Sequence, residues 1–292
     1  YRTRFPQTRM GVEQVYYDHF IRAREYGMAQ IEYRVALRNA KRKDIRAGRG
    51  PVAPRVDLEL ETLLQILREE RFVTCHSYRQ DEINMLMHVA DSLGFRLNTF
   101  THILEGYKVA DKLAEHGAGG SSFSDWWAYK YEVKDAIPYN GAVLHHQGVV
   151  TAFNSDDAEM ARRLNQEAAK AYKYGRVPEE EALKFVTLNP AKLLHIDHKT
   201  GSLLPGKDAD VVVWSDHPLS IGAKAEQTFV EGVRCFDKDR DLALREAMRE
   251  ERARLTAKMY ASGETSGGKD QKRPVERLET HYHCDTLTDE NR

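Results

Sequence analysis

RFVTCH, at residues 71–76, ends in a histidine and is the first of three strand-like runs that decide the fold of this chain. LNTFTH, at residues 97–102, also ends in a histidine, and GVVTAFNSD, at residues 148–156, ends in an aspartate. Each run has the length and the β-branched or aromatic content of a strand, and a helical pattern follows each one. Strands that alternate with helices form parallel βαβ units, whose strands all end at one edge of the sheet. The sequence therefore predicts that two imidazoles and a carboxylate converge at that edge.

A fourth, shorter strand is predicted near residues 119–123, between the second and third runs. The four strand-plus-helix units recur at intervals of roughly 25 to 30 residues, which is close to the repeat of a (β/α)8 barrel of about 250 residues. Four units make half of such a barrel. The predicted class is α/β, the second half of a (β/α)8 TIM-type barrel, with helices at residues 11–47 and 58–70 before it.

The character of the sequence changes after residue 195. Residues 1–195 are predicted to hold the barrel portion with its N-terminal helical segment. Residues 196–238 carry turn-forming GSLLPGKDAD, the strand VVVW and a hairpin around Glu231-Gly232, so we expect a small β-sandwich segment there. A charged helix is predicted at residues 239–260. Residues 261–292 are poor in apolar side chains and are predicted to be a disordered tail.

The composition argues against several classes of partner. The net charge is -1, which provides no electrostatic basis for binding nucleic acid or an anionic membrane. No apolar run has the length of a membrane span. Cys75, Cys235 and Cys284 are too few and too scattered for a disulfide framework. The first residue is Tyr1, so we expect the natural beginning to lie upstream. The localisation stays open between cytoplasmic and, with an upstream signal, periplasmic or exported.

The strand ends supply the candidate site residues. Imidazole and carboxylate are ligands of divalent metals, so His76, His102 and Asp156 are predicted to bind one or two metal ions. The adjacent carboxylate, at position 157, is the alternative to Asp156, but its place suits a helix N-cap. Tyr78 and Arg79 follow the first histidine and are predicted to face the substrate. Arg79 can hold a substrate carboxylate through two hydrogen bonds, or it can be a surface residue at a helix entry.

These residues carry a resemblance to the amidohydrolase superfamily, and within it to its imidazolonepropionase-like and prolidase-like metal-dependent branch. His76, His102 and Asp156 resemble the metal ligands that end the fifth, sixth and eighth barrel strands of that family. TLNPAK, from Thr187, followed by GSL and PGKDAD, is similar to the family's passage from the last barrel helix into a small β-sandwich. The resemblance covers roughly residues 71–236.

The resemblance implies a zinc-dependent hydrolase that acts on a C–N bond in a dipeptide or a cyclic amide. Asp156 would then be both a metal ligand and the catalytic base that moves a proton from the attacking water to the leaving amine. The expected partner is a small amide or dipeptide substrate. Family members also carry a His-x-His pair on the first strand and a bridging Lys or Glu on the fourth. Nothing before His76 supplies these groups, and HYH at residues 281–283 lies beyond the predicted fold.

The chain is therefore predicted to be the C-terminal portion of the enzyme, incomplete when alone. A missing N-terminal half, or a second chain, would supply the other ligands. The alternative is a non-catalytic or complementing subunit that retains the half-barrel as an interaction domain. An open half-barrel exposes two strand edges, so we expect a homo-oligomer or pairing with another chain.

Overall fold

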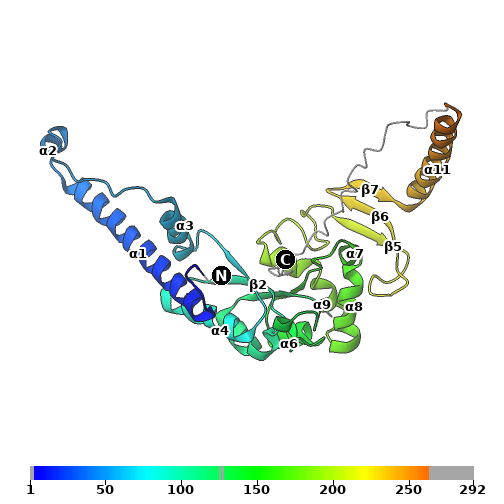
Figure 1. Ribbon diagram of the computed structural model, residues 1–292, viewed down its shortest axis with the longest axis horizontal. Helices are drawn as coiled ribbons and strands as arrows, with labels where there is room; N and C mark the ends of the chain where they lie inside the picture. The colour runs from blue at the N-terminus through cyan, green and yellow to red at the C-terminus, as the bar shows by residue number, and fades with distance from the viewer. Residues whose placement is uncertain (1–2, 125, 127, 263–292) are drawn as a thin grey trace. The chain divides into compact units, whose positions relative to one another are not determined.

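The structure, a computed structural model, describes residues 3–124, 126 and 128–262. All but the first two positions of the predicted tail at residues 261–292 lie outside this described part. The HYH sequence at residues 281–283 lies outside it as well. Figure 1 shows the helices and strands of the described part and labels many of them.

The chain divides into two compact units. Unit 1 comprises Tyr1–Asn154 and Glu167–Asp197, and unit 2 comprises Ser155–Gln166 and His198–Arg292. Unit 1 contains a parallel sheet, and unit 2 contains an antiparallel one.

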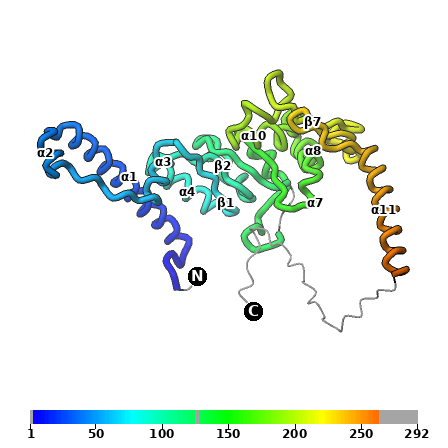
Figure 2. The backbone as a smooth tube through the Cα atoms, turned by 90° about the horizontal axis from the view of Figure 1, so that it is seen from above, coloured from blue at the N-terminus to red at the C-terminus, as the bar shows by residue number. Residues whose placement is uncertain are grey.

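The sheet of unit 1 has four parallel strands that lie in the order of the chain. They are β1 (Val73–Ser77), β2 (Leu97–His102), β3 (Gly119–Ser122) and β4 (Thr151–Phe153). Figure 2 shows β1 and β2 side by side. These are the four strands that the sequence predicts, so the α/β class with a parallel sheet is confirmed.

The strand β4 is shorter than the predicted run because the preceding helix end occupies its first residues. Gly148 has a φ of 88°, a left-handed conformation typical of the position after a helix. The N–H of Val149 donates to the carbonyl of Leu144 at 3.0 Å and so turns back onto α6 (Asn140–His146). Regular pairing can therefore begin only beyond this turn.

Helices follow the strands as the sequence predicts. The helix α4 (Gln80–Leu93) follows β1 and ends at Gly94, whose φ is 76°. The helix α5 (Ala110–His116) follows β2 and ends at Gly117, whose φ is 82°. Only glycine adopts these left-handed angles without steric cost, so each glycine ends its helix. Two short 3-10 turns, η1 (Gly106–Val109) and η2 (Tyr131–Val133), lie in the segments after β2 and β3. The helices further along the chain are α8 (Leu164–Gly175), α9 (Glu179–Lys184) and α10 (Leu188–Leu193).

Three helices precede the sheet: α1 (Arg9–Asn39), α2 (Arg42–Arg46) and α3 (Leu58–Leu67). The helices α1 and α3 pack through a buried cluster of Ala23, Tyr26 and Leu60. Gly27 allows the close approach, because a Cβ atom there would lie 2.7 Å from a methyl carbon of Leu64.

The single helix predicted at residues 11–47 is instead two helices, since Ala40 is extended with a ψ of 138°. Arg34, Arg38 and Arg42 follow one another at a spacing of four residues, which places like charges on one face. Such pairs weaken a helix, and this segment has no buried side chain to oppose them.

Unit 2 contains an antiparallel sheet of β5 (Val211–Trp214), β6 (Ala225–Val230) and β7 (Val233–Asp237). The predicted hairpin is confirmed, and Glu231 and Gly232 at its tip have φ values of 50° and 78°. Two positive φ angles are what a two-residue hairpin turn of the favoured twist needs. Among its described residues, this unit also contains the helices α7 (Ala158–Ala161) and α11 (Lys238–Ala261). A β-sandwich needs a second packed sheet, so the sandwich stays a prediction.

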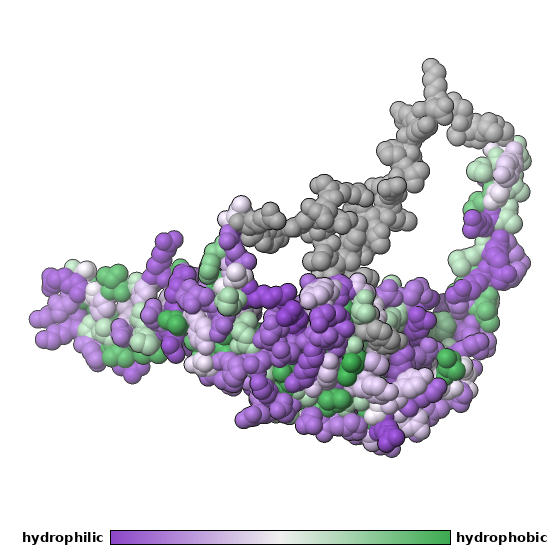
Figure 3. Space-filling view, turned by 60° about the horizontal axis from the view of Figure 1, so that its bottom comes forward, coloured by the Kyte–Doolittle hydropathy of each residue, from purple (hydrophilic) through white to green (hydrophobic). Residues whose placement is uncertain are grey.

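The surface is mixed in character. The face drawn in Figure 3 is mainly hydrophilic, with hydrophobic residues scattered over it. The helix α11 has no buried residue and exposes Leu244, Met248 and Leu255 among its charges. Within the described residues, no helix is both long enough and apolar enough to cross a membrane.

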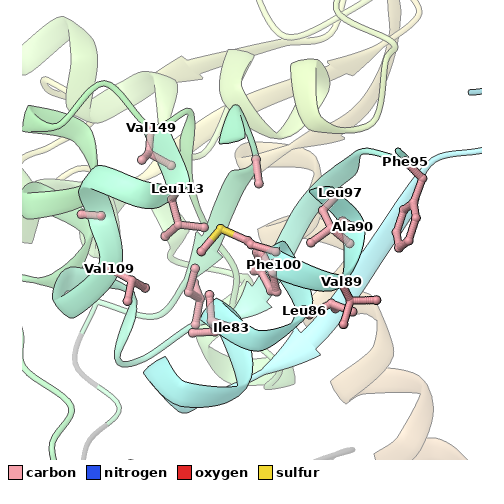
Figure 4. Close-up of a cluster of buried hydrophobic side chains, with 14 of the residues drawn as sticks. Ile83, Leu86, Val89, Ala90, Phe95, Leu97, Phe100, Val109, Leu113 and Val149 are labelled. Carbon is pink, nitrogen blue, oxygen red and sulfur yellow. The ribbon is translucent and has the colours of Figure 1, made fainter. Parts of the chain in front are cut away.

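The main core of unit 1 lies between α4, α5 and β2. Apolar positions recur along α4 at helical spacing, so one of its faces is buried. Figure 4 shows the side chains that point toward one another there, which include Ile83, Leu86, Phe100 and Leu113. Burying one such side chain contributes about 1.5 to 3 kcal/mol, so this cluster stabilises the packing of α4 and α5 on β2.

We expect Leu113→Ala to lower the free energy of unfolding of unit 1 by about 2 to 5 kcal/mol, because a fully buried leucine would leave a cavity. Leu194→Ala is the matched control, since Leu194 is 67% exposed and its loss should cost no more than about 0.5 kcal/mol. Urea denaturation followed by circular dichroism measures both values. Equal losses for the two variants would contradict this assignment of the core.

Candidate functional site

The two histidines at the ends of β1 and β2 lie next to each other. The ring centroids of His76 and His102 are 4.1 Å apart, and their planes meet at 60°. His102 is buried, whereas His76 is exposed. Tyr78 completes a cluster of three rings, with its centroid 4.9 Å from that of His76 and 5.4 Å from that of His102. The sheet thus brings together three of the residues that the sequence singled out.

The register of the sheet alone would separate the two imidazoles. Cys75 lies opposite Phe100, and His76 lies opposite Thr101. Side chains alternate along a strand, so His102 in a regular strand would share the core face of Phe100, away from His76. His102 instead has a φ of 68°, far from the value of about −120° in a parallel strand. This rotation about its N–Cα bond turns the imidazole toward His76.

A set of buried hydrogen bonds holds this left-handed turn. Ile103 also has a positive φ, of 40°, and its N–H donates to the carbonyl of Ser77 at 2.8 Å. The Ser122 hydroxyl donates to the carbonyl of His102 at 2.9 Å. The Asn140 amide donates to the carbonyl of Ile103 at 2.9 Å and to the Ser122 hydroxyl at 2.8 Å. Left-handed angles cost about 1 to 3 kcal/mol at such residues, so they persist only where the surroundings enforce them.

The Asn140 side chain is fully engaged in this network. Its Oδ1 accepts from the N–H of Tyr107 at 2.8 Å, and the residue is 1% exposed. Tyr107 lies in η1, just beyond the strained turn. One buried amide therefore joins the end of β2, the end of β3 and the start of α6.

Tyr78 is held from its other side by Lys130. The Lys130 ammonium donates to the Tyr78 hydroxyl at 2.9 Å and lies 4.1 Å from the centroid of its ring. The Tyr78 hydroxyl is 3.3 Å from Nε2 of His76. Phe123 and Trp126 stack with a centroid distance of 4.7 Å, and Phe123 contacts His102 at 5.0 Å. The histidine pair therefore lies beside a continuous group of rings.

Arg79, which was predicted to face the substrate, is paired with Asp81. The guanidinium donates to both carboxylate oxygens of Asp81, at 3.0 and 3.1 Å. This pairing raises the pKa of Arg79 and lowers the pKa of the Asp81 carboxyl. A substrate carboxylate would have to replace Asp81, so the role of Arg79 stays a prediction.

The acidic group predicted for the site lies at the start of unit 2. Asp156 has a φ of 51° and belongs to residues 155–166. Asp157 caps α7, because its carboxylate accepts from the N–H of Met160 at 2.8 Å. The carboxylate at position 157 therefore has the capping role expected for it. The role of Asp156 as ligand and base stays a prediction.

The histidine pair fits zinc in kind but does not complete a site. In the described part of the chain, no group of three or more His, Cys, Asp and Glu side chains is arranged to hold a metal ion. Imidazole nitrogen is a preferred zinc ligand, and protein sites use three or four ligands. Two imidazoles on one tetrahedral zinc have centroids about 5 Å apart. The rings at 4.1 Å would have to move apart slightly, which the exposure of His76 allows.

The sequence did not reveal the residues that hold the turn. Asn140 precedes the predicted helix at residues 142–147, and nothing local separates it from an ordinary residue at a helix start. Its three partners lie 18, 33 and 37 residues away along the chain. Ser122 looked like part of a short strand only. Contacts at such separations leave no local signal in the sequence.

The chain matches a known protein family. The model of the amidohydrolase family matches residues 74–264. This range begins in the first strand and includes both histidines and Asp156.

Similar proteins include amidohydrolase tasK of Hapsidospora irregularis, which is 32% identical over 186 residues, covering 62% of this chain and 19% of that protein. The urease subunit alpha of Yersinia pestis is 36% identical over 109 residues, covering 31% of this chain and 18% of that protein. This chain thus spans about a fifth of the length of these curated relatives. A solved amidohydrolase from Thermotoga maritima MSB8 has a TM-score of 0.67 and 31% identity, covering 81% of this chain and 58% of that chain.

We expect Asn140→Ala to lower the free energy of unfolding by about 3 kcal/mol, because it leaves buried donors and acceptors unsatisfied. The exchange of the amide protons of Ile103 and Tyr107 should also become faster, since both lie at the released turn. Urea denaturation and hydrogen exchange measure these effects. Asn84→Ala is the control, because the side chain of Asn84 accepts a hydrogen bond from Lys112 at an exposed position. Unchanged exchange at Ile103 would show that Asn140 does not hold the turn.

Proposed function

This chain belongs to the amidohydrolase family, and we propose that it is the C-terminal portion of a metal-dependent hydrolase that cleaves a C–N bond. We propose a dipeptide or a cyclic amide as the substrate and zinc as the metal. The single observation that carries the proposal is the contact of His76 and His102 at the ends of neighbouring parallel strands, with ring centroids 4.1 Å apart. Parallel α/β sheets build their sites at this edge.

Each residue has a distinct part in the proposed reaction. His76 and His102 would each hold the ion through one ring nitrogen. When bound, a divalent ion would lower the pKa of a water molecule and polarise the substrate carbonyl. Asp156 would take a proton from the attacking water and deliver it to the nitrogen of the leaving amine. Arg79 would exchange Asp81 for a substrate carboxylate, which costs little because the ion pair is partly exposed.

Two further observations support an incomplete site in this chain. Ser77 Oγ and Asn154 Oδ1 are buried atoms with no hydrogen-bond partner in the described part. Ser77 ends β1 and Asn154 follows β4, so both lie at the edge of the sheet that carries the histidines. Leaving such atoms unsatisfied costs about 1 to 3 kcal/mol each, so groups from elsewhere would stabilise this edge.

We propose that the rest of the barrel pairs with the two outer strands. Among the described residues β1 and β4 are the outer strands of the sheet. β4 is partly covered, because the N–H of Phe153 donates to the carbonyl of Phe185 at 2.8 Å. β1 exposes Thr74 and His76, and Phe72 before it is exposed as well. The solved relative, of which this chain covers 58%, has enough further length to supply the missing strands.

The alternative is a complementing subunit without activity of its own. Within the described residues, no third ligand lies beside the histidine pair. This agrees equally well with a complementing subunit and with the C-terminal portion of a single-chain enzyme. The two readings differ in where the other ligands come from. In the first they lie upstream in the same polypeptide, and in the second they lie on another chain.

We expect the purified chain of 292 residues to bind less than one zinc ion per chain and to hydrolyse no dipeptide, because the His-x-His pair and the bridging Lys or Glu of the family would have to come from outside it. The protein extended by its upstream coding sequence should bind one or two. Inductively coupled plasma mass spectrometry and a dipeptide panel measure both properties. Restoration by a separately expressed chain would instead support the complementing subunit.

His102→Ala in the extended protein should abolish zinc binding. His88→Ala is the matched control, since His88 is exposed on α4 and should leave the zinc content unchanged. Zinc at full stoichiometry with turnover in the short chain would contradict the incomplete site. An extended protein without zinc would contradict the metal-dependent function.

A further inference from the structure

We propose that Lys130 is a positioning residue that acts on His76 through the hydroxyl of Tyr78. It selects which ring nitrogen of His76 carries the proton and how the ring is oriented. The inference deepens the proposed function, on which it rests for its purpose, because a metal ligand must present one defined unprotonated nitrogen. With the proton on Nδ1 that nitrogen is Nε2, where a metal ion would replace the Tyr78 hydroxyl. The contacts themselves, and the test below, require neither metal nor turnover.

The three side chains form a line of hydrogen-bonding groups. The Lys130 ammonium is 2.9 Å from the Tyr78 hydroxyl oxygen, and that oxygen is 3.3 Å from Nε2 of His76. The rings of Tyr78 and His76 meet edge to face at 88°. Tyr78 as a whole is 8% exposed, and both hydrogen bonds of its hydroxyl are partly buried.

The chemistry of these groups gives the line a direction. An ammonium group only donates hydrogen bonds, so the Tyr78 oxygen must be the acceptor. The phenol proton can then be donated to an acceptor, and Nε2 of His76 lies 3.3 Å from the hydroxyl oxygen. Accepting a bond from a cation also makes the hydroxyl a stronger donor. A neutral His76 that accepts at Nε2 must carry its proton on Nδ1.

Tertiary packing fixes Lys130 in this place. Val133 is completely buried in a cluster with Tyr78, Leu104 and Phe123. Its N–H donates to the carbonyl of Lys130 at 3.1 Å, and its carbonyl accepts from the N–H of Ala128 at 3.2 Å. The segment around Lys130 is therefore held by its own backbone hydrogen bonds and is anchored by Val133 against the ring of Tyr78.

His116 provides an internal reference for the proposed tautomer. Its Nε2 accepts from the N–H of Leu97 at 3.2 Å, and its Nδ1 lies 2.8 Å from the carboxylate of Asp91. These partners require the proton on Nδ1. The structure thus assigns the same tautomer to His76 and His116 through different partners.

The test is nitrogen-15 NMR of the histidine side chains, recorded without metal at a pH where the imidazoles are neutral. In the chain as it exists we expect His76 and His116 both to show a protonated Nδ1. Lys130→Met should shift His76 toward the Nε2-protonated form by roughly fivefold, which corresponds to about 1 kcal/mol. Lys130→Arg, which still donates to the hydroxyl, should restore the original ratio.

A matched control and a double variant separate this role from simple packing. Lys134→Met removes a lysine of the same segment that lies over Tyr131 and pairs with Asp135, and it should leave His76 unchanged. In a Tyr78→Phe background, Lys130→Met should have no further effect, because the oxygen that transmits it is gone.

Two results would overturn the proposal. One is a His76 tautomer that is the same in Lys130→Met as in the original chain, with the His116 signature intact. The other is an effect of Lys130→Met that persists in Tyr78→Phe. If Lys130→Met loses the His116 signature and so fails to fold, Tyr78→Phe alone decides, and an unchanged His76 ratio there rejects the proposal. These readouts need neither metal nor activity, so failure of this proposal can be told apart from failure of the proposed function.

Discussion

The left-handed turn at the end of β2 is the constraint on which the histidine pair depends. A regular strand would point His102 into the core beside Phe100, and His76 would have no imidazole near it. The hydrogen bonds of Ser122 and Asn140 keep the turn against its conformational cost. A site that needs strain needs rigid neighbours, and here those neighbours are buried polar groups.

The hydrophobic packing of unit 1 places those polar groups. Asn140 is the first residue of α6, and the next residue, Gly141, lies so close to Phe153 that a Cβ atom would be 2.5 Å from its ring. Leu144, one turn further, is completely buried. The helix is therefore pressed onto β4 at the position that directs the Asn140 amide toward the end of β2.

The two loops that carry the site residues are also linked to each other. The N–H of Glu105 donates to the carbonyl of Tyr78 at 3.0 Å, and its buried carboxylate accepts from the N–H of Gln80 at 3.0 Å. The loop after β1 thus cannot move independently of the loop after β2. Together with the Lys130 contact, this gives His76 and His102 a common support although one ring is exposed and the other is buried.

Much of the architecture follows from the sequence alone. The four parallel strands, the helices between them and the hairpin at Glu231 were predictable because hydrophobic periodicity and turn chemistry act over a few residues. The limits of the elements were less predictable, as the late start of β4 and the break after α1 show. At β4 the turn at the end of α6 overrides the pattern of apolar residues. After α1 a row of like charges does so.

The sequence by itself determined the fold class, the edge of the sheet where the chemistry lies, and the histidines that end β1 and β2. Only the tertiary structure decided that the two imidazoles face each other, because their orientation depends on one positive φ angle at His102. It also decided the roles of Asn140 and Lys130, whose partners lie up to 37 and 52 residues away. Local sequence encodes local conformation, whereas contacts across such separations exist only once the chain has packed.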